Sequence, residues 1–278
     1  ANWSPATVPT ATSNVIVPPG PGSVVISSAD VTVVSLSLGR PMVLGNGRAL
    51  SATLANIAAT LTLDSGSTIL GGEWTITQDG NLFFSFQCTQ PPDFLSISTP
   101  LLNNITINGD IIINTNVNSG VRWNNVVLNG TISVISGALY IYFQGDQTFT
   151  GTLTANSDDG VYLCTAMGPV GTLTIAPSAI IQGGNIIFKT VEVPGGCIYW
   201  YTWGSDGSLQ MRLHNLGSIM ANVTGRTIAI ECPFLNLGTL IGPVSASGGN
   251  YGVSYTTAGP ADQAVVYNNR SDPGSGSN

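Results

Sequence analysis

The sequence predicts an all-β fold, a single-stranded parallel β-helix (β-solenoid) of roughly 11–13 coils with irregular loops and capping ends. Three observations predict it. A 17-residue pattern occurs twice, short strand-like segments bounded by Gly, Asn, Asp or Pro follow one another along the chain, and no segment keeps a helical period of 3.6 over about ten residues. Together they predict many short strands and no helix.

The repeated pattern lies at residues 60–76 and 172–188, and the two windows align without a gap. Both open with Thr-Leu-Thr, and both carry a double glycine, at 71–72 and 183–184. Each window reads as a short strand, a corner, an apolar pair, the double glycine and another strand. One coil of a β-solenoid has this pattern, so the double glycine is predicted to mark a corner and not a ligand site.

A tighter repeat lies near the C-terminus, with Asn-Leu-Gly-Ser-Ile at 215–219 and Asn-Leu-Gly-Thr-Leu at 236–240, and a looser relative at 129–132. Asn and Gly tolerate the left-handed backbone of a tight corner, and stacked Asn amides can hydrogen-bond from coil to coil. The spacing predicts coils of roughly 20–25 residues. At about 4.8 Å per coil, the rod would be on the order of 50–60 Å long.

The chain divides into three predicted parts. Residues 1–23 are rich in Pro and Thr and are predicted to be a leader or N-terminal cap, because Pro cannot donate to a strand ladder. Residues 24–257 form the predicted solenoid, with a lateral loop at 87–100 where two prolines interrupt the pattern. Residues 258–278 are predicted to be a polar C-terminal tail or linker. Further expected strands are 24–26, 31–38, 42–44, 50–54, 81–86, 104–113, 121–134, 138–143 and 151–154.

Composition argues against several functions. Charged residues make up 8% of the chain, compared with about 25% in a typical globular protein. The net charge is −7 and the seven basic residues are scattered singly, so nucleic-acid binding is not expected. No apolar run reaches the roughly 18 residues of a membrane span. Abundant Ser, Thr and Asn suit a fold that stacks like residues, because their side chains can hydrogen-bond along a ladder.

The Thr-Leu-Thr strands, Gly-Gly corners and Asn-x-Gly-Ser/Thr turns resemble the parallel β-helix repeats of secreted bacterial surface proteins, such as autotransporter passenger domains and filamentous-haemagglutinin-like adhesins. The resemblance covers residues 24–257 and concerns architecture. It implies an elongated extracellular scaffold and carries no catalytic residues across. A eukaryotic extracellular filament or cell-coat glycoprotein is the other possibility that the glycosylation sequons raise.

Four cysteines and five glycosylation sequons bear on the environment. The cysteines are far apart and show no metal-binding spacing, so an even count favours two disulfides, with buried free thiols as the alternative. The cysteines are Cys88, Cys164, Cys197 and Cys232. Each sequon is a candidate glycan acceptor if the protein is secreted by a eukaryotic cell. The acceptors are Asn2, Asn104, Asn129, Asn222 and Asn269.

Parallel β-helices also host polysaccharide-cleaving enzymes, which use converging carboxylates. Here the acids are mostly isolated, and the pair Asp158-Asp159 before Gly160 reads as a turn. The single histidine, His214, has no Cys or His partner nearby in sequence. The Ser nucleophile elbow and the phosphate-binding loop are both missing from the sequence. We therefore expect no catalytic residues, no cofactor and no metal.

The strongest candidate for a binding surface is an aromatic cluster, whose outward members could form a platform for sugar rings or for another protein. Packing beneath a loop or against a neighbouring coil is the favoured alternative, since large exposed apolar patches are uncommon. The cluster is Tyr199, Trp200, Tyr201 and Trp203.

The sequence thus favours a non-enzymatic, secreted structural protein, a stiff rod that assembles end to end with copies of itself into a filament or a surface or adhesive layer. The other function considered is a carbohydrate-binding or carbohydrate-cleaving β-helix that uses the cluster at 199–203. Extracellular or cell-surface localisation is expected in both cases, with glycans or a cell surface as further partners.

Overall fold

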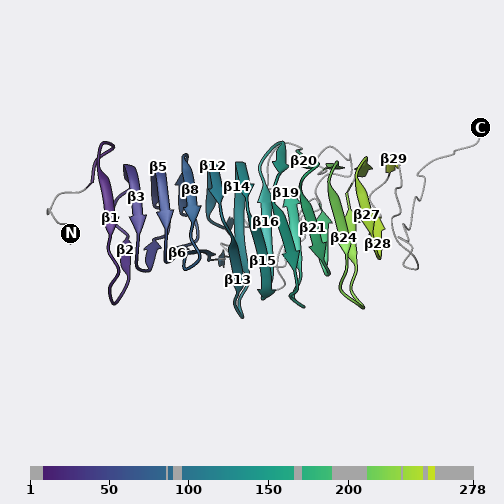
Figure 1. Cartoon of the computed structure of the whole chain (residues 1–278), viewed down its shortest axis with the longest axis horizontal. Coiled ribbons are helices and arrows are strands. Elements are labelled where there is room, and N and C mark those ends of the chain that lie inside the picture. The colour runs from purple at the N-terminus through teal and green to yellow at the C-terminus, as the bar shows by residue number, and fades with distance from the viewer. Residues whose placement is uncertain are drawn as a thin grey trace, which may run out of the picture.

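The computed structural model of the chain describes residues 9–85, 87–89, 96–165, 171–189, 212–232, 234–246 and 250–253. Within these ranges every regular element is a β-strand and none is a helix, which confirms the predicted all-β class. The strands lie side by side in a row along the longest axis of the molecule, from β1 at one end to β29 near the other (Figure 1).

Parallel strands make up four of the five sheets. The 12-stranded sheet contains β1 (Asn14–Val17), β3 (Val31–Leu38), β5 (Ala49–Ile57), β7 (Thr68–Leu70), β8 (Glu73–Ile76), β12 (Leu101–Asn108), β14 (Ser119–Asn129), β16 (Leu139–Phe143), β19 (Val161–Thr165), β22 (Ile186–Lys189), β25 (Ile228–Glu231) and β28 (Val244–Ala246). The 4-stranded sheet contains β2 (Val24–Ile26), β4 (Met42–Leu44), β6 (Thr60–Leu63) and β9 (Asn81–Phe84).

The two other parallel sheets occupy the C-terminal part of the row. The 6-stranded sheet contains β13 (Ile111–Asn114), β15 (Thr131–Ser136), β18 (Thr152–Ala155), β21 (Ile180–Gly183), β24 (Ser218–Ala221) and β27 (Thr239–Ile241). The 5-stranded sheet contains β17 (Gln147–Phe149), β20 (Thr172–Ile175), β23 (Arg212–Asn215), β26 (Phe234–Asn236) and β29 (Asn250–Val253). The fifth sheet is the antiparallel pair β10 (Gln87–Thr89) and β11 (Ser96–Ser98).

Several pairs of neighbouring strands are separated by 21 residues of chain, and others are further apart where a longer segment comes between them. Leu101 pairs with Arg122, which is 122 − 101 = 21 residues later, and the pairs β15–β18 and β24–β27 have the same spacing. The predicted repeat of roughly 20–25 residues therefore holds for these pairs. Strand β25 follows β22 at 228 − 186 = 42 residues, because residues 190–211 come between them in the chain.

Side chains connect the sheets where backbone pairing stops. Asn81 of β9 donates its amide to the carbonyl of Ile112 in β13 over 2.8 Å and accepts the Ile112 N–H over 3.0 Å, so its side chain takes the place of a backbone partner. Thr150, just after β17, bonds both the N–H and the C=O of Leu128 in β14. Gln147 accepts the N–H of Val126. The 4-stranded sheet is thereby tied to the 6-stranded one, and the 12-stranded sheet to the 5-stranded one.

Alternating inward residues form one continuous apolar core along the row. Trp123 is its largest described aromatic centre, with the Phe149 ring stacked at 6.1 Å and the Phe143 ring edge-on at 5.9 Å between centroids. Trp74 is buried too, and its indole N–H donates to the carbonyl of Gly71. Each such side chain contributes about 1.5–3 kcal/mol through burial.

Glycines stand where corners of successive strands touch. A Cβ on Gly130 would lie 2.0 Å from the carbonyl oxygen of Gly109, and one on Gly238 would lie 2.2 Å from that of Gly217. In the double glycine at 71–72, Gly72 has a φ of +87° and leaves no room for a Cβ against the carbonyl of Ala52. The predicted corner is confirmed for the double glycine at 183–184, which lies between strands of two different sheets. It is wrong for the one at 71–72, because β7 and β8 on either side of it belong to the same sheet and both pair with β5.

The two copies of the 17-residue pattern form the same succession of three strands in different sheets. In the first copy β6 belongs to the 4-stranded sheet and β7 and β8 to the 12-stranded sheet. In the second copy β20, β21 and β22 belong to three different sheets. The double glycine therefore joins two strands of one sheet in the first copy and strands of two different sheets in the second.

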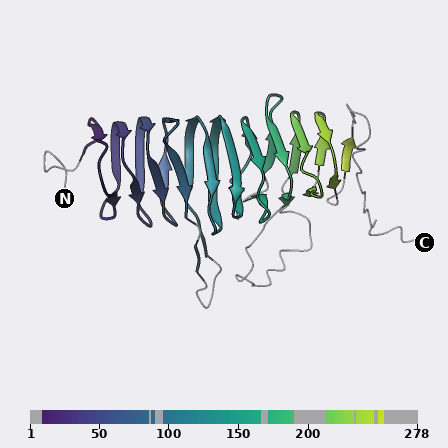
Figure 2. The same ribbon diagram turned by 60° about the horizontal axis from the view of Figure 1, so that its bottom comes forward.

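Two segments contain more structure than the sequence predicts. Strand β1 lies inside the predicted leader at 1–23, where it pairs in parallel with β3 as the end strand of its sheet. The predicted lateral loop at 87–100 contains the hairpin strands β10 and β11, which stand out from the side of the row (Figure 2). Their polar, proline-interrupted sequence concealed both pairings.

Candidate functional site

The most regular polar feature on the surface is a double row of asparagines on β12 and β14, which we call the asparagine ladder. In the sequence it is the motif Asn-Asn followed by Asn-Gly, present twice at a spacing of 21 residues. The amide Nδ2 of each β14 asparagine donates to the Oδ1 of its β12 partner, at distances of 2.9, 2.8 and 3.0 Å. The pairs are Asn124–Asn103, Asn125–Asn104 and Asn129–Asn108.

Backbone conformation explains why asparagine occupies the middle pair. Asn104 and Asn125 have φ values of 54° and 53°, a left-handed conformation that Asn adopts more readily than most residues. Each amide offers both a donor and an acceptor, so every asparagine can serve one neighbour on each side. The ladder continues to Glu73 of β8, whose carboxylate accepts from Asn108 over 2.7 Å. Such a surface links strands without requiring alternating charges.

A second asparagine pair is buried. Asn215 of β23 and Asn236 of β26 are fully inaccessible to solvent, and the Asn215 amide donates to the Asn236 Oδ1 over 2.7 Å. The Asn215 Oδ1 also accepts the N–H of Gly217 over 3.1 Å, which closes the corner. The coil-to-coil amide contact that the sequence repeat predicts is confirmed at this pair.

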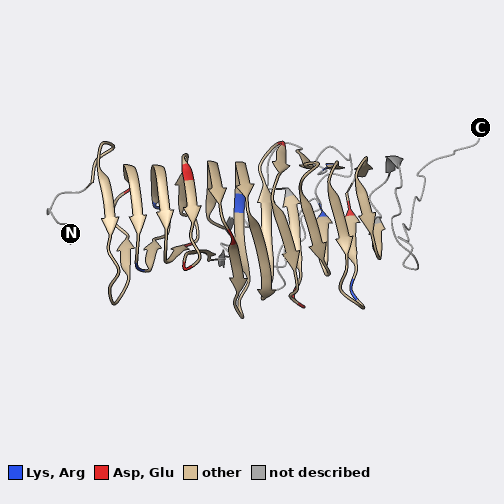
Figure 3. Cartoon of the chain, in the orientation of Figure 1, with Lys and Arg blue, Asp and Glu red and all other residues tan. Residues whose placement is uncertain are grey.

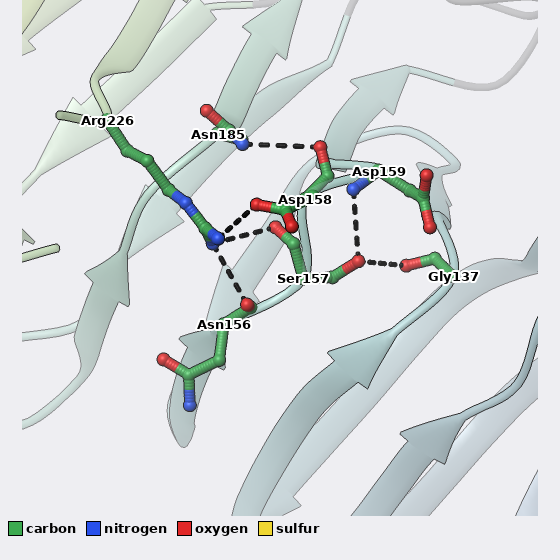
Figure 4. A network of polar contacts seen from close by, with 7 residues as sticks. All are labelled: Gly137, Asn156, Ser157, Asp158, Asp159, Asn185 and Arg226. Carbon is green, nitrogen blue, oxygen red and sulfur yellow. Dashed lines mark hydrogen bonds and ion pairs between the residues drawn. The ribbon is translucent and has the colours of Figure 1, made fainter.

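Arg226 joins corners that lie far apart in the chain (Figure 4). Its Nη1 donates to the backbone carbonyls of Asn156 and Ser157 at 2.9 and 3.0 Å, and its Nη2 bonds the Asp158 carboxylate. The Arg226 side chain reaches this corner across Gly184, where a Cβ would lie 2.3 Å from the Arg226 Cβ. The second glycine of the pair at 183–184 therefore makes room for this contact, which we call the arginine clasp.

The arginine clasp explains how the carboxylates of Asp158 and Asp159 are arranged. Residues 158 and 159 form a bend, as the sequence predicts, and the Ser157 hydroxyl orders it by donating to the carbonyl of Gly137 and accepting the N–H of Asp159. Asp158 is engaged by Arg226, so the two carboxylates do not converge on a common ligand. Their arrangement fits a corner and offers no acid–base pair.

A tyrosine cluster lies on the side of the 12-stranded sheet that faces away from the main core. The Tyr140 and Tyr162 rings stack with centroids 4.6 Å apart, and Lys189 places its Nζ 5.8 Å from the Tyr162 ring centre. Tyr142 and Cys164 complete the cluster. Burial raises the pKa values of Tyr140, Tyr142 and Cys164, and neighbouring ionisable groups raise those of the two tyrosines further.

The tyrosine cluster offers neither an exposed binding surface nor a reactive thiol. Tyr140 and Tyr142 are only 5% and 3% exposed, so they offer no flat platform to a sugar ring. The neutral Cys164 thiol is a poor nucleophile, because the reactive form is the thiolate. The cluster therefore acts as a second, smaller core.

Charged side chains are thinly spread over the described strands (Figure 3). Across the residues that the structure describes, there is no group of three His, Cys, Asp or Glu side chains able to hold a metal ion. His214 sits in β23 between Thr174 and Leu235 of the neighbouring strands. Neither neighbour is a carboxylate or a second histidine that could exchange a proton with it. The half-buried imidazole therefore fits an ordinary position in the parallel strand pairing of β20, β23 and β26.

The three sequon asparagines within the described ranges all lie on the surface. Asn104 and Asn129 belong to the asparagine ladder, whereas Asn222 follows β24 in a loop, where its side-chain amide donates to the Gln182 Oε1 over 3.4 Å. Asn2 and Asn269 lie outside the described residues. Glycosylation at all five remains a prediction.

The structure describes the side chains of two of the four cysteines. Cys164 and Cys232 are buried free thiols, and burial together with Glu231 raises the pKa of Cys232 to about 12. Cys88 is in β10, and nothing further is described of its side chain; Cys197 lies outside the described residues. Because Cys164 and Cys232 are free, the prediction that the four cysteines form two disulfides is wrong, and the alternative of buried free thiols holds for these two. The aromatic cluster at 199–203 also lies outside the described residues.

Comparison with known proteins gave no match to any family model, curated protein or solved structure. No helix among the described residues is long and apolar enough to span a membrane.

The features that sequence reasoning overlooked are the asparagine ladder and the arginine clasp. A search for repeats at 21 residues would have found the Asn-Asn motif, whereas no sequence signal pairs Arg226 with Asp158.

Proposed function

We propose that the chain is a parallel β-solenoid that serves as a stiff, non-enzymatic scaffold and assembles end to end into an extracellular filament or surface layer. The parallel registers at a spacing of about one coil support the solenoid, as do the Asn81 and Thr150 bridges that join the sheets. With these bridges counted, lines of neighbouring strands continue from one end of the row to the other.

The proposed stiffness comes from the backbone ladders along the row, which side-chain and corner contacts reinforce between particular strands. Backbone ladders, stacked asparagines and closely touching corner glycines all resist bending, because any bend would lengthen hydrogen bonds on one side. The fold therefore suits load-bearing or spacing better than recognition of a small molecule. A repeat protein of this kind presents a long surface rather than a pocket.

The single observation that carries the assembly proposal is that the described strands at both ends of the row contain no charged residue. The end strands β1 and β2 read NVIV and VVI, and β27, β28 and β29 at the other end read TLI, VSA and NYGV. Soluble β-proteins usually protect such edges with Lys, Pro or a bulge. The β26–β29 pair has a register irregularity, but the described end strands contain neither Lys nor Pro, which favours addition of further copies.

The non-enzymatic assignment is supported by the isolation of the described carboxylates and by the clasped Asp158. Extracellular localisation is supported by the surface position of Asn104, Asn129 and Asn222 and by the low charge. The carbohydrate-directed function considered from the sequence gains no support from the described aromatic side chains, because the tyrosine cluster is buried. We therefore propose the scaffold alone.

Analytical ultracentrifugation over a range of protein concentrations tests this function. The expected result is a sedimentation profile that shifts toward larger species as the concentration rises, with a frictional ratio typical of rods. A single compact species at every concentration would contradict the proposal. Sedimentation at low concentration also separates a rod-shaped monomer from a globular one.

A further inference from the structure

We propose that the open edge of β1 binds the C-terminal end of a second copy of the chain, with β29 of that copy joining β1 and its β27 joining β2. This inference rests on the proposed scaffold function and specifies the contact that would build it. The partner is identical in sequence, and the added strands run parallel to those they join.

The backbone of β1 has hydrogen-bonding groups turned away from its only described partner strand. The Val17 carbonyl accepts the N–H of Gly39, so Val17 directs its peptide groups toward β3. In a parallel ladder successive residues point their N–H and C=O groups alternately to the two sides. Asn14 and Ile16 therefore turn theirs to the open side, where an incoming strand can pair with them.

The two ends of the row present matching lines of strands. One line runs from β1 through β3, β5, β8, β12 and β14, crosses to β17 through Thr150, and continues through β20, β23 and β26 to β29. Another runs from β2 through β4, β6 and β9, crosses to β13 through Asn81, and ends at β27. Each line begins at one end and finishes at the other.

Translation of a second copy along the row therefore places β29 beside β1 and β27 beside β2. Two joints form at once, and both use parallel pairing of the kind already present inside the chain. Ile16 and Val25, which are 75% and 57% exposed at this end, would each gain a neighbour on the adjoining copy. The contact is heterologous, so it does not close on itself and generates an open filament.

Substitutions at Ile16 test the joint at the level of one backbone group. Ile16→Pro removes the outward N–H and leaves the β1–β3 hydrogen bonds of Val15 and Val17 in place, as edge positions tolerate proline. Ile16→Thr keeps that N–H and changes only an exposed side chain. A second pair of variants uses charge: Ile16→Lys places a lysine at the end strand, and Ile135→Lys places one on β15 inside the row, where the isoleucine is 50% exposed.

Negative-stain electron microscopy of the full chain and its four variants at one high concentration gives the answer. We expect filaments for the wild type, Ile16→Thr and Ile135→Lys, and isolated rods for Ile16→Pro and Ile16→Lys, with unchanged thermal unfolding in all five. Filaments of normal length in both Ile16→Pro and Ile16→Lys would overturn the β1 joint while leaving the scaffold function standing. Isolated particles in the wild type itself would overturn the proposed assembly.

Discussion

The side-chain amide of Asn215 donates a hydrogen bond to that of Asn236 over 2.7 Å, and both side chains are fully buried. The two residues hold partner positions on β23 and β26, so the contact ties neighbouring strands through their side chains as well as their backbones. A buried polar contact of this kind is stable only while both members are present.

Replacement of Asn236 by Ala should lower the free energy of unfolding by about 1–3 kcal/mol, because the buried Asn215 amide then loses its closer acceptor and keeps the longer contact of 3.3 Å with the Thr239 carbonyl. Chemical denaturation measures the change. Asn129→Ala is the matched control: it removes a ladder amide of the same type at an exposed position, where water replaces the lost partner. Equal losses for the two variants would contradict the burial argument.

Replacement of Gly238 by Ala should cost more than about 3 kcal/mol, the upper end of ordinary overpacking, because the new Cβ would lie 2.2 Å from the carbonyl oxygen of Gly217. The obstacle is backbone, so the strands themselves must separate. Gly20→Ala provides the control, since its nearest contact is a 3.6 Å approach to the end of the Arg40 side chain. We expect the control to change stability by less than about 0.5 kcal/mol in the same denaturation experiment.

Replacement of Arg226 by Ala should open the corner at 156–159 without unfolding the whole chain, because three acceptors on that corner lose their donor. Hydrogen exchange followed by mass spectrometry should show faster exchange there and at Gly184, with core strands such as β14 unchanged. Arg226→Lys serves as a control for charge, as an ammonium cannot reproduce the planar fork of the guanidinium. Wild-type exchange rates in Arg226→Ala would show that the clasp does not order the corner.

Alkaline pH should destabilise the fold through its buried thiols and phenols. The pKa of Cys232 rises from an ordinary value of 9.0 to about 12, mainly through burial. Between these two values the unfolded chain loses a proton that the folded chain keeps, so the stabilising effect is complete below pH 9 and is lost as the pH rises toward 12. One group contributes a slope of at most about 1.4 kcal/mol per pH unit.

Unfolding free energies of the wild type and Cys232→Ala, measured from pH 7 to 11, test this linkage. The two curves should run parallel below pH 9, and the variant should fall less steeply above it. Cys164 and the buried tyrosines shift in the same direction, so the variant keeps part of the alkaline loss. Identical slopes over the whole range would contradict the assignment to Cys232.

The strands were predictable from local periodicity, whereas contacts between residues far apart in the chain were mostly not predictable from the sequence. The strands at 24–26, 31–38 and 42–44 coincide with β2, β3 and β4, because alternation and bounding turns are local signals. The Asn215–Asn236 contact was predictable from a repeat of identical residues. The arginine clasp was not predictable, since Arg226 and Asp158 are 68 residues apart in the sequence. The contact also requires a residue without a side chain at position 184, where Gly184 leaves room for Arg226.

The corner at the second double glycine was predictable, but the position of the first one between two strands of the same sheet was not. The pattern at 60–76 and 172–188 encodes a local geometry, and only the lengths of chain between corners decide which sheet each strand enters. Strand β1 was hidden in a proline-rich segment because a four-residue strand between turns carries too little alternation to stand out.

Electron cryomicroscopy of concentrated, purified protein is the most direct test of the proposed coaxial stacking. The account predicts filaments of uniform width in which strands lie across the filament axis and repeat every 4.7–4.9 Å or so along it, without a break in that spacing where one copy meets the next. Dispersed particles at high concentration, or filaments whose strands run along the axis, would contradict it.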